Sequence, residues 1–492
     1  MKNLILSLDQ GTTGSTALVM NTKGKVLGSS NVPFKQIFPK AGWVEHDPDE
    51  ILKSMKKAIR LVFKKIDKDP KDILTIGITN QRETVVFWDG KTGKTFGNAI
   101  VWQCRRTTKR AEEIKKNGDA SWIKKKTGLS VDPYFSSTKI EWFLKKNKSS
   151  HKNLRVGTID TFLLWNLTGG ESFYTEPSNA SRMQLFNIKT QKWDEKLLDY
   201  FGVPKSVLPE VVDSNSNFGS VKGFKPLVDG TPITGILGDQ QAALFGQGAL
   251  KAGDLKCTFG TGSFILLNTG GELTYSKAGL LSTVAWRLKG KGPVYALEGG
   301  AFNCGSCINW FVSEFSSLKK SSDIGPLAQS VPSSLGVKFA PTFSGLGAPY
   351  WNSESRGAFV GLSRGVKGAH MARAVLEGLS FQNTLIFEAM EKDFGKLKNI
   401  FVDGGVSRSD FLMDRQAVFS GKKLVRPQNI ETTAVGAALM AGVGAGVFKA
   451  GSKQLNPVEK VFRKNIGAVD KKLVRSYRGL FESLSLRPFI EE

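Results

Sequence analysis

Two aspartates in the sequence each follow a short apolar run, a placement that suits phosphate chemistry. Asp9 follows the run 4–8 and opens the segment 9–14, which is rich in glycine and threonine. Glycines let the backbone come close to a phosphate, and threonines add hydroxyl donors. A carboxylate beside such a loop usually binds Mg²⁺, often through water. The alternative is a simple hairpin turn, and the loop alone leaves both interpretations open.

Asp239 directly follows the apolar run 233–237. A carboxylate at a strand end can act as a general base toward a hydroxyl, and phosphoryl transfer needs a group that orients the nucleophile. The competing interpretation is a helix N-cap, because residues 240–245 could begin a helix.

Arg82 and Glu83 follow a third apolar run, residues 73–79. One side chain donates and the other accepts hydrogen bonds, so together they could bind two hydroxyls of a polyol. A mutual salt bridge is the alternative.

The elements that must position these residues alternate between strands and helices. Apolar runs at 4–8, 17–20 and 26–27 are separated by glycine-containing turns, which predicts antiparallel strands. The same layout returns at 255–259, 264–268, 281–288 and 294–297, around the turn 260–263, which indicates an internal duplication of a domain. The apolar stripe at 372–390 has helical spacing, so the fold class is α/β. A glycine cluster predicts a boundary between residues 245 and 255.

Composition excludes several classes of protein. Of the 492 residues, 40% are hydrophobic and 23% are charged, as in an ordinary globular protein. The net charge of +25 attracts anions in general, but the lysines are spread over helical segments, so we expect a solvated surface and no nucleic-acid partner. Four cysteines and three histidines favour packing of Cys304 and Cys307 over a metal site. The low-charge run 434–448 is too short for a membrane span and predicts a buried helix in a cytoplasmic protein.

A series of segments, in order along the chain, resembles the FGGY family of carbohydrate kinases. They are residues 8–13, 42–48, 77–84, 102–107, 132–136, 238–243, 343–351 and 402–405. The segments around Arg82, Trp102 and Tyr134 are similar to the branch of the family that phosphorylates glycerol, and they differ from the kinases of pentuloses and hexuloses.

The resemblance implies an α/β protein with two ribonuclease H-like (actin-like ATPase) domains flanking a catalytic cleft. The domains would be residues 1–250, with the first phosphate loop and most of the polyol site, and residues 251–492, with the second phosphate loop and the adenosine side. The implied reaction transfers the γ-phosphoryl group of Mg-ATP to a terminal hydroxyl of glycerol, giving sn-glycerol 3-phosphate. By analogy with the family, we expect a homo-oligomer, a dimer or a tetramer.

The resemblance also implies two sets of site residues. Asp239 would be the general base. The residues that bind glycerol would be Arg82, Glu83, Trp102, Tyr134, Asp239, Gln240 and Phe264. Asp9 would help to bind magnesium. The residues that bind ATP would be Thr12, Thr13, Gly14, Thr16, Thr261, Gly305, Asn309, Gly405 and Ser409.

Three of these positions depart from the family pattern, and all three lie on the nucleotide side. Thr16 stands where the family usually has an arginine, Asn309 where it has a glutamine, and Ser409 where it has an asparagine. A neutral hydroxyl does not replace a bidentate charged contact. We therefore expect the polyol side to follow the family more closely than the nucleotide side.

Two other functions compete with this one. A kinase of the same family could act on erythritol, dihydroxyacetone or a ketose instead. A protein of this fold could also bind ATP without catalysis, because fold does not determine function. Retention of Asp9, Asp239, Arg82 and Glu83 argues against a pure binding protein, which needs no general base.

Overall fold

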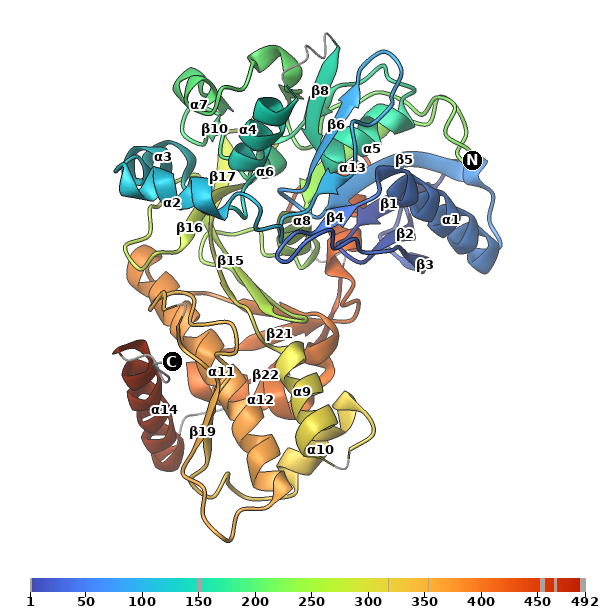
Figure 1. The fold of residues 1–492 in the computed structure, drawn as a ribbon. Helices are drawn as coiled ribbons and strands as arrows, with labels where there is room; N and C mark the ends of the chain where they lie inside the picture. The colour runs from blue at the N-terminus through green and yellow to red at the C-terminus, as the bar shows by residue number, and fades with distance from the viewer. Residues whose placement is uncertain are drawn as a thin grey trace.

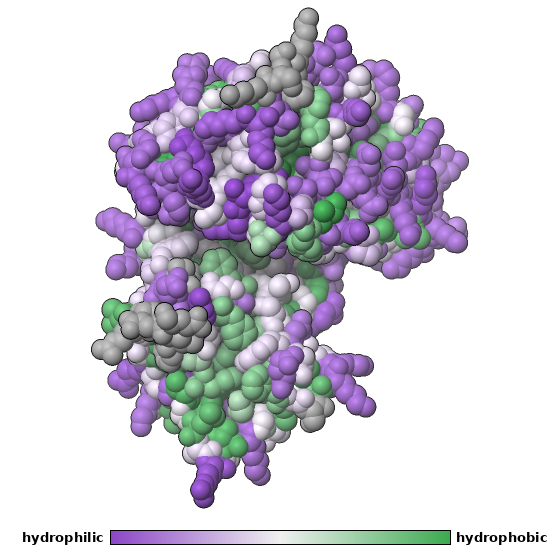
Figure 2. All heavy atoms as spheres, in the orientation of Figure 1, coloured by the Kyte–Doolittle hydropathy of each residue, from purple (hydrophilic) through white to green (hydrophobic). Residues whose placement is uncertain are grey.

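The structure is a computed structural model that describes residues 2–147, 153–316, 318–352, 354–451, 456–463 and 467–486. Figure 1 shows two bodies, one above the other, with the N-terminus in the upper body and the C-terminal helix in the lower one. The surface narrows between the two bodies, and hydrophilic residues cover most of the visible face of the upper body (Figure 2).

The upper body is built on a five-stranded sheet. In spatial order its strands are β13 (Ile233–Gly238), β5 (Ile73–Asn80), β1 (Leu4–Gln10), β2 (Gly14–Asn21) and β3 (Val26–Pro33). Side chains alternate between the two faces of a strand, so Leu4, Leu6 and Leu8 of β1 enter one core and Ile5 enters another. Helices α1 (Pro48–Ile66) and α5 (Ile159–Leu167) pack on the face of the three leucines.

A second sheet has seven strands. In spatial order they are β16 (Leu281–Arg287), β17 (Pro293–Ala301), β15 (Ser263–Gly270), β14 (Leu255–Phe259), β20 (Ile400–Asp403), β21 (Leu424–Pro427) and β22 (Val458–Phe462). The row β17-β15-β14-β20-β21 repeats the order and the strand directions of β3-β2-β1-β5-β13. The predicted internal duplication is therefore confirmed.

Helices cover the second sheet and form the core of the lower body. They are α9 (Gly305–Phe315), α10 (Ile324–Gln329), α11 (Gly368–Phe394) and α12 (Asp410–Ser420). Cys304 and Cys307 are free and buried in this core, as predicted.

Helix α13 (Thr432–Gly444) packs on the remaining face of the first sheet beside α8 (Asp239–Gly246). Glycines permit this close approach, because a Cβ on Gly436 would lie 1.8 Å from Ala242 O and one on Gly77 would lie 2.2 Å from Ala437 O. The predicted buried helix 434–448 is present, but its predicted end was wrong. The chain leaves the helix after Gly444, since Gly446 takes a φ of +74° and turns the backbone. The predicted division of the chain at residue 250 remains a prediction.

The rest of the upper body forms a smaller unit around a four-stranded sheet, in the order β4-β7-β6-β8. Its elements, together with the other strands and α-helices of the described chain, are β4 (Glu45–His46), β6 (Val85–Asp89), β7 (Ala99–Ile100), α2 (Thr108–Lys116), α3 (Ala120–Thr127), α4 (Ser136–Lys146), β8 (Leu154–Thr158), β9 (Tyr174–Thr175), α6 (Pro177–Ala180), β10 (Phe186–Asn187), β11 (Lys192–Trp193), α7 (Glu195–Phe201), β12 (Glu210–Val211), β18 (Lys338–Ala340), β19 (Ala358–Val360) and α14 (Ala468–Leu486). Among the described residues, none of the helices combines the length and the apolar character that a membrane span needs.

Candidate active site

The three strands that carry the predicted chemistry are neighbours and run in the same direction. β1, β5 and β13 pair in parallel, and Asp9, Arg82 and Asp239 lie at or just beyond their carboxyl ends. In α/β sheets this edge is where ligands bind. The N-cap interpretation of Asp239 is wrong, because Gly238 is the N-cap of α8 and Asp239 is the first residue of the helix.

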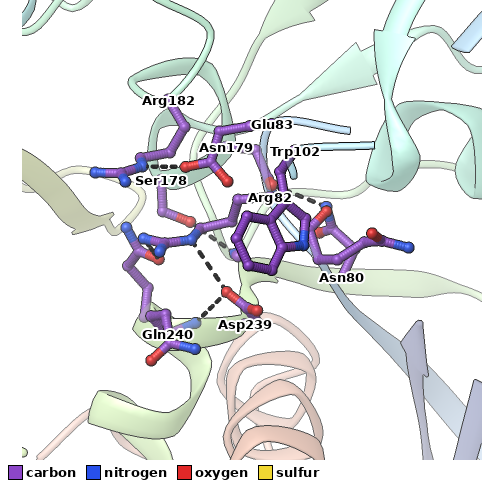
Figure 3. Close-up of polar contacts among 12 residues, drawn as sticks. Asn80, Arg82, Glu83, Trp102, Ser178, Asn179, Arg182, Asp239 and Gln240 are labelled. Atoms are coloured by element: carbon purple, nitrogen blue, oxygen red, sulfur yellow. Dashed lines mark hydrogen bonds and ion pairs between the residues drawn. The ribbon is translucent and has the colours of Figure 1, made fainter. Parts of the chain in front are cut away.

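Arg82 is the centre of a buried network of charges. Its Nη1 and Nη2 donate to both carboxylate oxygens of Glu298, over 2.7 and 2.9 Å. Its Nε lies 3.0 Å from Asp239 Oδ1 (Figure 3). The predicted alternative, a mutual salt bridge of Arg82 and Glu83, is wrong, because the two side chains choose different partners.

Glu83 pairs with Arg182, whose Nε lies 2.5 Å from Glu83 Oε1 (Figure 3). Arg182 also contacts Glu298 Oε1 at 3.0 Å, so the network runs from Asp239 through Arg82, Glu298 and Arg182 to Glu83. Burial opposes the ionisation of Glu298, but Arg182 and Arg82 outweigh it and lower its pKa to about 2. Fork-like pairing of this kind fixes position as well as charge.

Glu83 has an unusual backbone. Its φ is +61°, in the left-handed region that non-glycine residues seldom adopt. The side chain is buried, and burial raises its pKa although Arg182 and Arg82 act in the opposite direction. Such strain persists where surrounding contacts enforce it, and it concentrates at functional sites.

Aromatic residues line a cavity of about 210 Å³ beside the network. Tyr134 and Arg182 contribute from the upper body, and Phe264, Glu298 and Trp351 contribute from the second half of the chain. Trp102 packs edge-on against Tyr134 with ring centroids 5.2 Å apart. The structure therefore gathers Trp102, Tyr134 and Phe264 near Arg82 and Glu83, and the contact of these residues with glycerol stays a prediction.

Gln240 extends the site toward the second sheet. Its backbone N donates to Asp239 Oδ1 over 2.6 Å, and its side-chain oxygen accepts from the ammonium of Lys256. Lys256 is buried on β14, where burial lowers its pKa although Asp403 and Asp239 act to raise it.

Each predicted phosphate loop is a tight turn closed by a backbone hydrogen bond between two glycines, and the second turn is one residue shorter than the first. Gly11 N donates to Gly14 O over 2.9 Å between β1 and β2, and Gly260 N donates to Gly262 O over 2.9 Å between β14 and β15. Thr13 and Thr261 are exposed at the two turns.

Other contacts tie each turn to its surroundings. Gly305, at the start of α9, donates its N–H to Gly260 O over 2.9 Å, so α9 begins against the second turn. In the first turn, Thr12 Oγ1 accepts from Trp102 Nε1 over 3.0 Å. This hydrogen bond joins a residue predicted for the nucleotide to one predicted for the polyol.

The remaining nucleotide-side residues are more dispersed. Thr16 Oγ1 accepts from Asn31 Nδ2 over 2.9 Å, and Asn309, exposed on α9, accepts from Ser321 Oγ over 2.6 Å. Gly405 is exposed after β20, and Ser409 caps α12. These residues contact no member of the charged network within the described part of the chain.

Asp9 is the candidate for a metal-binding carboxylate. Burial raises its pKa to about 8, and the carboxylates of Asp239 and Glu431 add to the effect. Within the described residues Asp9 has no ion pair, and no group of three or more His, Cys, Asp or Glu could hold a metal ion. A carboxyl whose ionisation burial opposes would be stabilised in its charged form by a cation, and Mg²⁺ usually takes one or two such oxygen ligands together with substrate phosphates.

Sequence reasoning missed Glu298, Arg182 and Lys256. Glu298 stands in a strand of otherwise uncharged residues, and Lys256 is the one charged residue of β14. A charge inside an apolar strand was the available signal, because buried charges are almost always paired.

Comparison with known proteins agrees with this geometry. The model of the N-terminal domain of the FGGY family of carbohydrate kinases matches residues 4–246, and that of the C-terminal domain matches residues 255–445. A glycerol kinase of Bdellovibrio bacteriovorus is 51% identical over 471 residues, which cover 94% of each chain. One of Alkaliphilus oremlandii is 48% identical, with 91% of this chain and 90% of the relative covered.

Solved structures show the same architecture. The crystal structure of Plasmodium falciparum glycerol kinase with ADP has a TM-score of 0.92 at 34% identity and covers 100% of this chain and 99% of its own. A gluconate kinase from Lactobacillus acidophilus has a TM-score of 0.89 at 24% identity, covers 99% of both chains and supports the fold. The two family models together match most of the sequence, and the described chain belongs to the FGGY family of carbohydrate kinases.

Proposed function

We propose that this protein transfers the γ-phosphoryl group of ATP to a terminal hydroxyl of glycerol, giving ADP and sn-glycerol 3-phosphate. One observation carries the proposal: Asp239 is the accessible end of a buried charge network. Its side chain is 28% exposed, against 2% for Arg82 and 7% for Glu298. The similarity to relatives named glycerol kinase supports glycerol as the acceptor.

The hydrogen bonds of Asp239 suit it to the role of general base. Arg82 Nε and Gln240 N both approach Oδ1, while Oδ2 makes no hydrogen bond within the described residues. Oδ1 is thus held in place and Oδ2 is free to accept the proton of the attacking hydroxyl. As that proton moves to Asp239, the hydroxyl oxygen forms its bond to the γ-phosphorus and the bond to ADP breaks.

The other polyol-side residues would bind and orient glycerol. Arg82 and Glu83 offer a donor and an acceptor to its hydroxyls, Gln240 adds an amide, and Trp102, Tyr134 and Phe264 supply apolar surface for its carbons. Holding the hydroxyl near the phosphorus lowers the entropic part of the barrier. A cleft that excludes water also prevents wasteful hydrolysis of ATP.

Two turns would bind the nucleotide phosphates from opposite sides. Thr12, Thr13 and Gly14 belong to the first turn, and Thr261 belongs to the second, with Gly305 next to it. Asp9 would hold Mg²⁺, which when bound offsets negative charge on the phosphates and on Asp9 itself. Thr16, Asn309, Gly405 and Ser409 would lie toward the rest of the nucleotide.

The test follows ADP and glycerol 3-phosphate from purified protein with Mg-ATP, with and without glycerol. Replacement Asp239→Asn is expected to lower kcat by about 10²- to 10⁴-fold. Asp199→Asn, on the exposed surface of α7, is the matched control and should retain wild-type turnover. Turnover that needs dihydroxyacetone or a ketose in place of glycerol would show that the protein is a kinase with a different acceptor substrate. ATP binding without turnover on any of these would contradict the proposal.

A further inference from the structure

The distance between Asp239 and Arg82 depends on the ends of two adjacent strands. In the parallel pairing of β13 and β5, Gly238 lies opposite Asn80, and each stands one or two residues before its functional side chain. β13 is an edge strand, so no further strand of the sheet supports its outer side. A one-ångström shift of such a strand end would move the base away from its substrate.

The short helix α6 lies beside these two strand ends, and the buried carboxylate of Glu176 organises it. Oε1 accepts from Asn179 N over 2.8 Å, from Asn179 Nδ2 over 3.1 Å and from the Ser178 hydroxyl. Oε2 accepts from Ser178 N over 2.9 Å and from Ser214 Oγ over 2.7 Å. Burial raises the pKa of Glu176 to about 7, against the effect of these hydrogen bonds.

Two neighbouring side chains of α6 reach from this carboxylate to the two strand ends. Ser178 Oγ accepts from Gly238 N over 2.8 Å while its own proton is directed to Glu176. Asn179 Oδ1 accepts from Asn80 Nδ2 over 3.0 Å. Figure 3 shows Ser178 and Asn179 beside Arg82, Asn80 and Asp239.

A cap for a four-residue helix does not explain these outward contacts. The two backbone bonds from Ser178 N and Asn179 N to Glu176 already cap α6. The side chains of Ser178 and Asn179 add bonds to β13 and β5, which belong to a different sheet from the neighbours of α6 in sequence. These extra bonds serve the strand ends rather than the helix.

We propose that Ser178, oriented by Glu176, is a positioning residue that fixes Gly238 and so places the Asp239 carboxylate for the reaction. The inference rests on the proposed function for its effect on turnover, but the fixing of Gly238 can be tested without turnover. Asn179 performs the corresponding task for β5 through Asn80. Glu176, Ser178 and Asn179 together form a clip across the ends of β13 and β5.

Ser178→Ala removes the acceptor for Gly238 N and leaves the site residues in place. We expect kcat for glycerol phosphorylation to fall about 10- to 100-fold, with the KM for ATP unchanged. Ser178→Thr keeps the hydroxyl and should restore most of kcat. Ser214→Ala is the matched control, because it removes one hydrogen bond from the same carboxylate but none from Gly238. It also removes the acceptor of Arg287 N, so it should lower the melting temperature while kcat stays within about twofold, as for loss of structural hydrogen bonds outside the site.

Hydrogen–deuterium exchange separates this proposal from the function. Peptides that cover residues 236–242 should exchange faster in Ser178→Ala than in wild type or Ser214→Ala, because Gly238 N loses its partner. If the wild-type protein fails to phosphorylate glycerol, the proposed function is rejected. The role of the clip is then tested by the exchange measurement alone. Unchanged exchange in Ser178→Ala overturns the clip. Equal losses of kcat in Ser178→Ala and Ser214→Ala overturn it as well.

Discussion

The polyol side and the nucleotide side of the cleft are built in different ways. On the polyol side, two arginines and three carboxylates bind one another, and most of them are buried. On the nucleotide side, backbone turns present exposed threonines, and Asp9 has no ion pair within the described residues. The first region is preorganised by side chains, whereas the second is a backbone frame whose charge is balanced when its ligand binds.

This difference predicts where each property of the enzyme resides. Buried, mutually paired charges cannot rearrange without leaving a charge unpaired, so the polyol side should select its substrate strictly. Backbone turns bind phosphates of any nucleoside triphosphate, so the nucleotide side should tolerate substitutions of its side chains.

Arg82→Met should have the largest effect, and it should impair glycerol phosphorylation without weakening nucleotide binding. It leaves Glu298 and Asp239 without their shared cation, so kcat/KM for glycerol should fall about 10³-fold. Affinity for ADP, measured by calorimetry, should stay within about threefold. Arg478→Met is the control, because Arg478 also pairs with a carboxylate, that of Glu388, but is 37% exposed and does not line the cavity. Equal losses of glycerol and ADP binding would contradict the division into two regions.

Glu298→Gln should lower the free energy of unfolding by about 3 kcal/mol at pH 7, because two buried arginines lose a charged partner. The pKa of Glu298 is lowered to about 2, so its stabilisation is complete above the unfolded value of 4.5 and is lost as pH falls toward 2. The advantage of wild type should therefore narrow by about 1 kcal/mol between pH 6 and pH 3.5 in denaturant titrations.

Glu388→Gln is the control for this measurement. Glu388 pairs with Arg478 at an exposed site, where an ion pair contributes little. An advantage of wild type over Glu298→Gln that grows on acidification would contradict the assigned pairing.

Trp102→Phe should have an intermediate effect. It tests whether the hydrogen bond between Trp102 and Thr12 couples the polyol side to the nucleotide side. The ring keeps its contact with Tyr134, but the hydrogen bond to Thr12 is lost. We expect KM for glycerol and for ATP to rise together, about three- to tenfold, in steady-state assays. Thr12→Val should act in the same way, and the double variant should add little, because both changes remove one bond. Additive effects would show that the bond does not couple the sites.

Thr16→Arg should have the smallest effect. An arginine can offer the charged contact that Thr16 lacks, so we expect KM for ATP to fall about two- to fivefold while KM for glycerol is unchanged. An unchanged KM for ATP would mean that the departure at this position has no bearing on nucleotide binding.

Local patterns predicted the parts of the fold that local chemistry determines. The run 4–8 with Asp9 and its repeat at 255–259 gave strands, turns and the duplication, because alternating side chains and glycine turns act over a few residues. Asp239 and Arg82 were predicted from their strand ends. The pairing of Arg82 with Glu298 was not predicted, because these two residues are 216 positions apart and meet only when the two sheets come together.

The strand that carries Glu298 shows why the network escaped prediction. The apolar run 294–297 suggested a strand, whereas β17 continues to Ala301 through Glu298 and two glycines. A charge and two glycines end a strand by local rules, and tertiary pairing with Arg82 and Arg182 overrides them here. Likewise, nothing in the local sequence around Glu176 showed that its carboxylate accepts hydrogen bonds from five donors.

The packing of α13 against the first sheet determines how the chain can be divided into fragments. A fragment that ends at residue 250 would leave Ile5, Leu18 and Met20 facing water, since α13 packs into the core that they form. Such a fragment should aggregate when made alone and recover when the rest of the chain is supplied as a separate polypeptide. The two repeats are therefore not independent folding units, because α13, from the second half of the chain, completes the core of the first sheet.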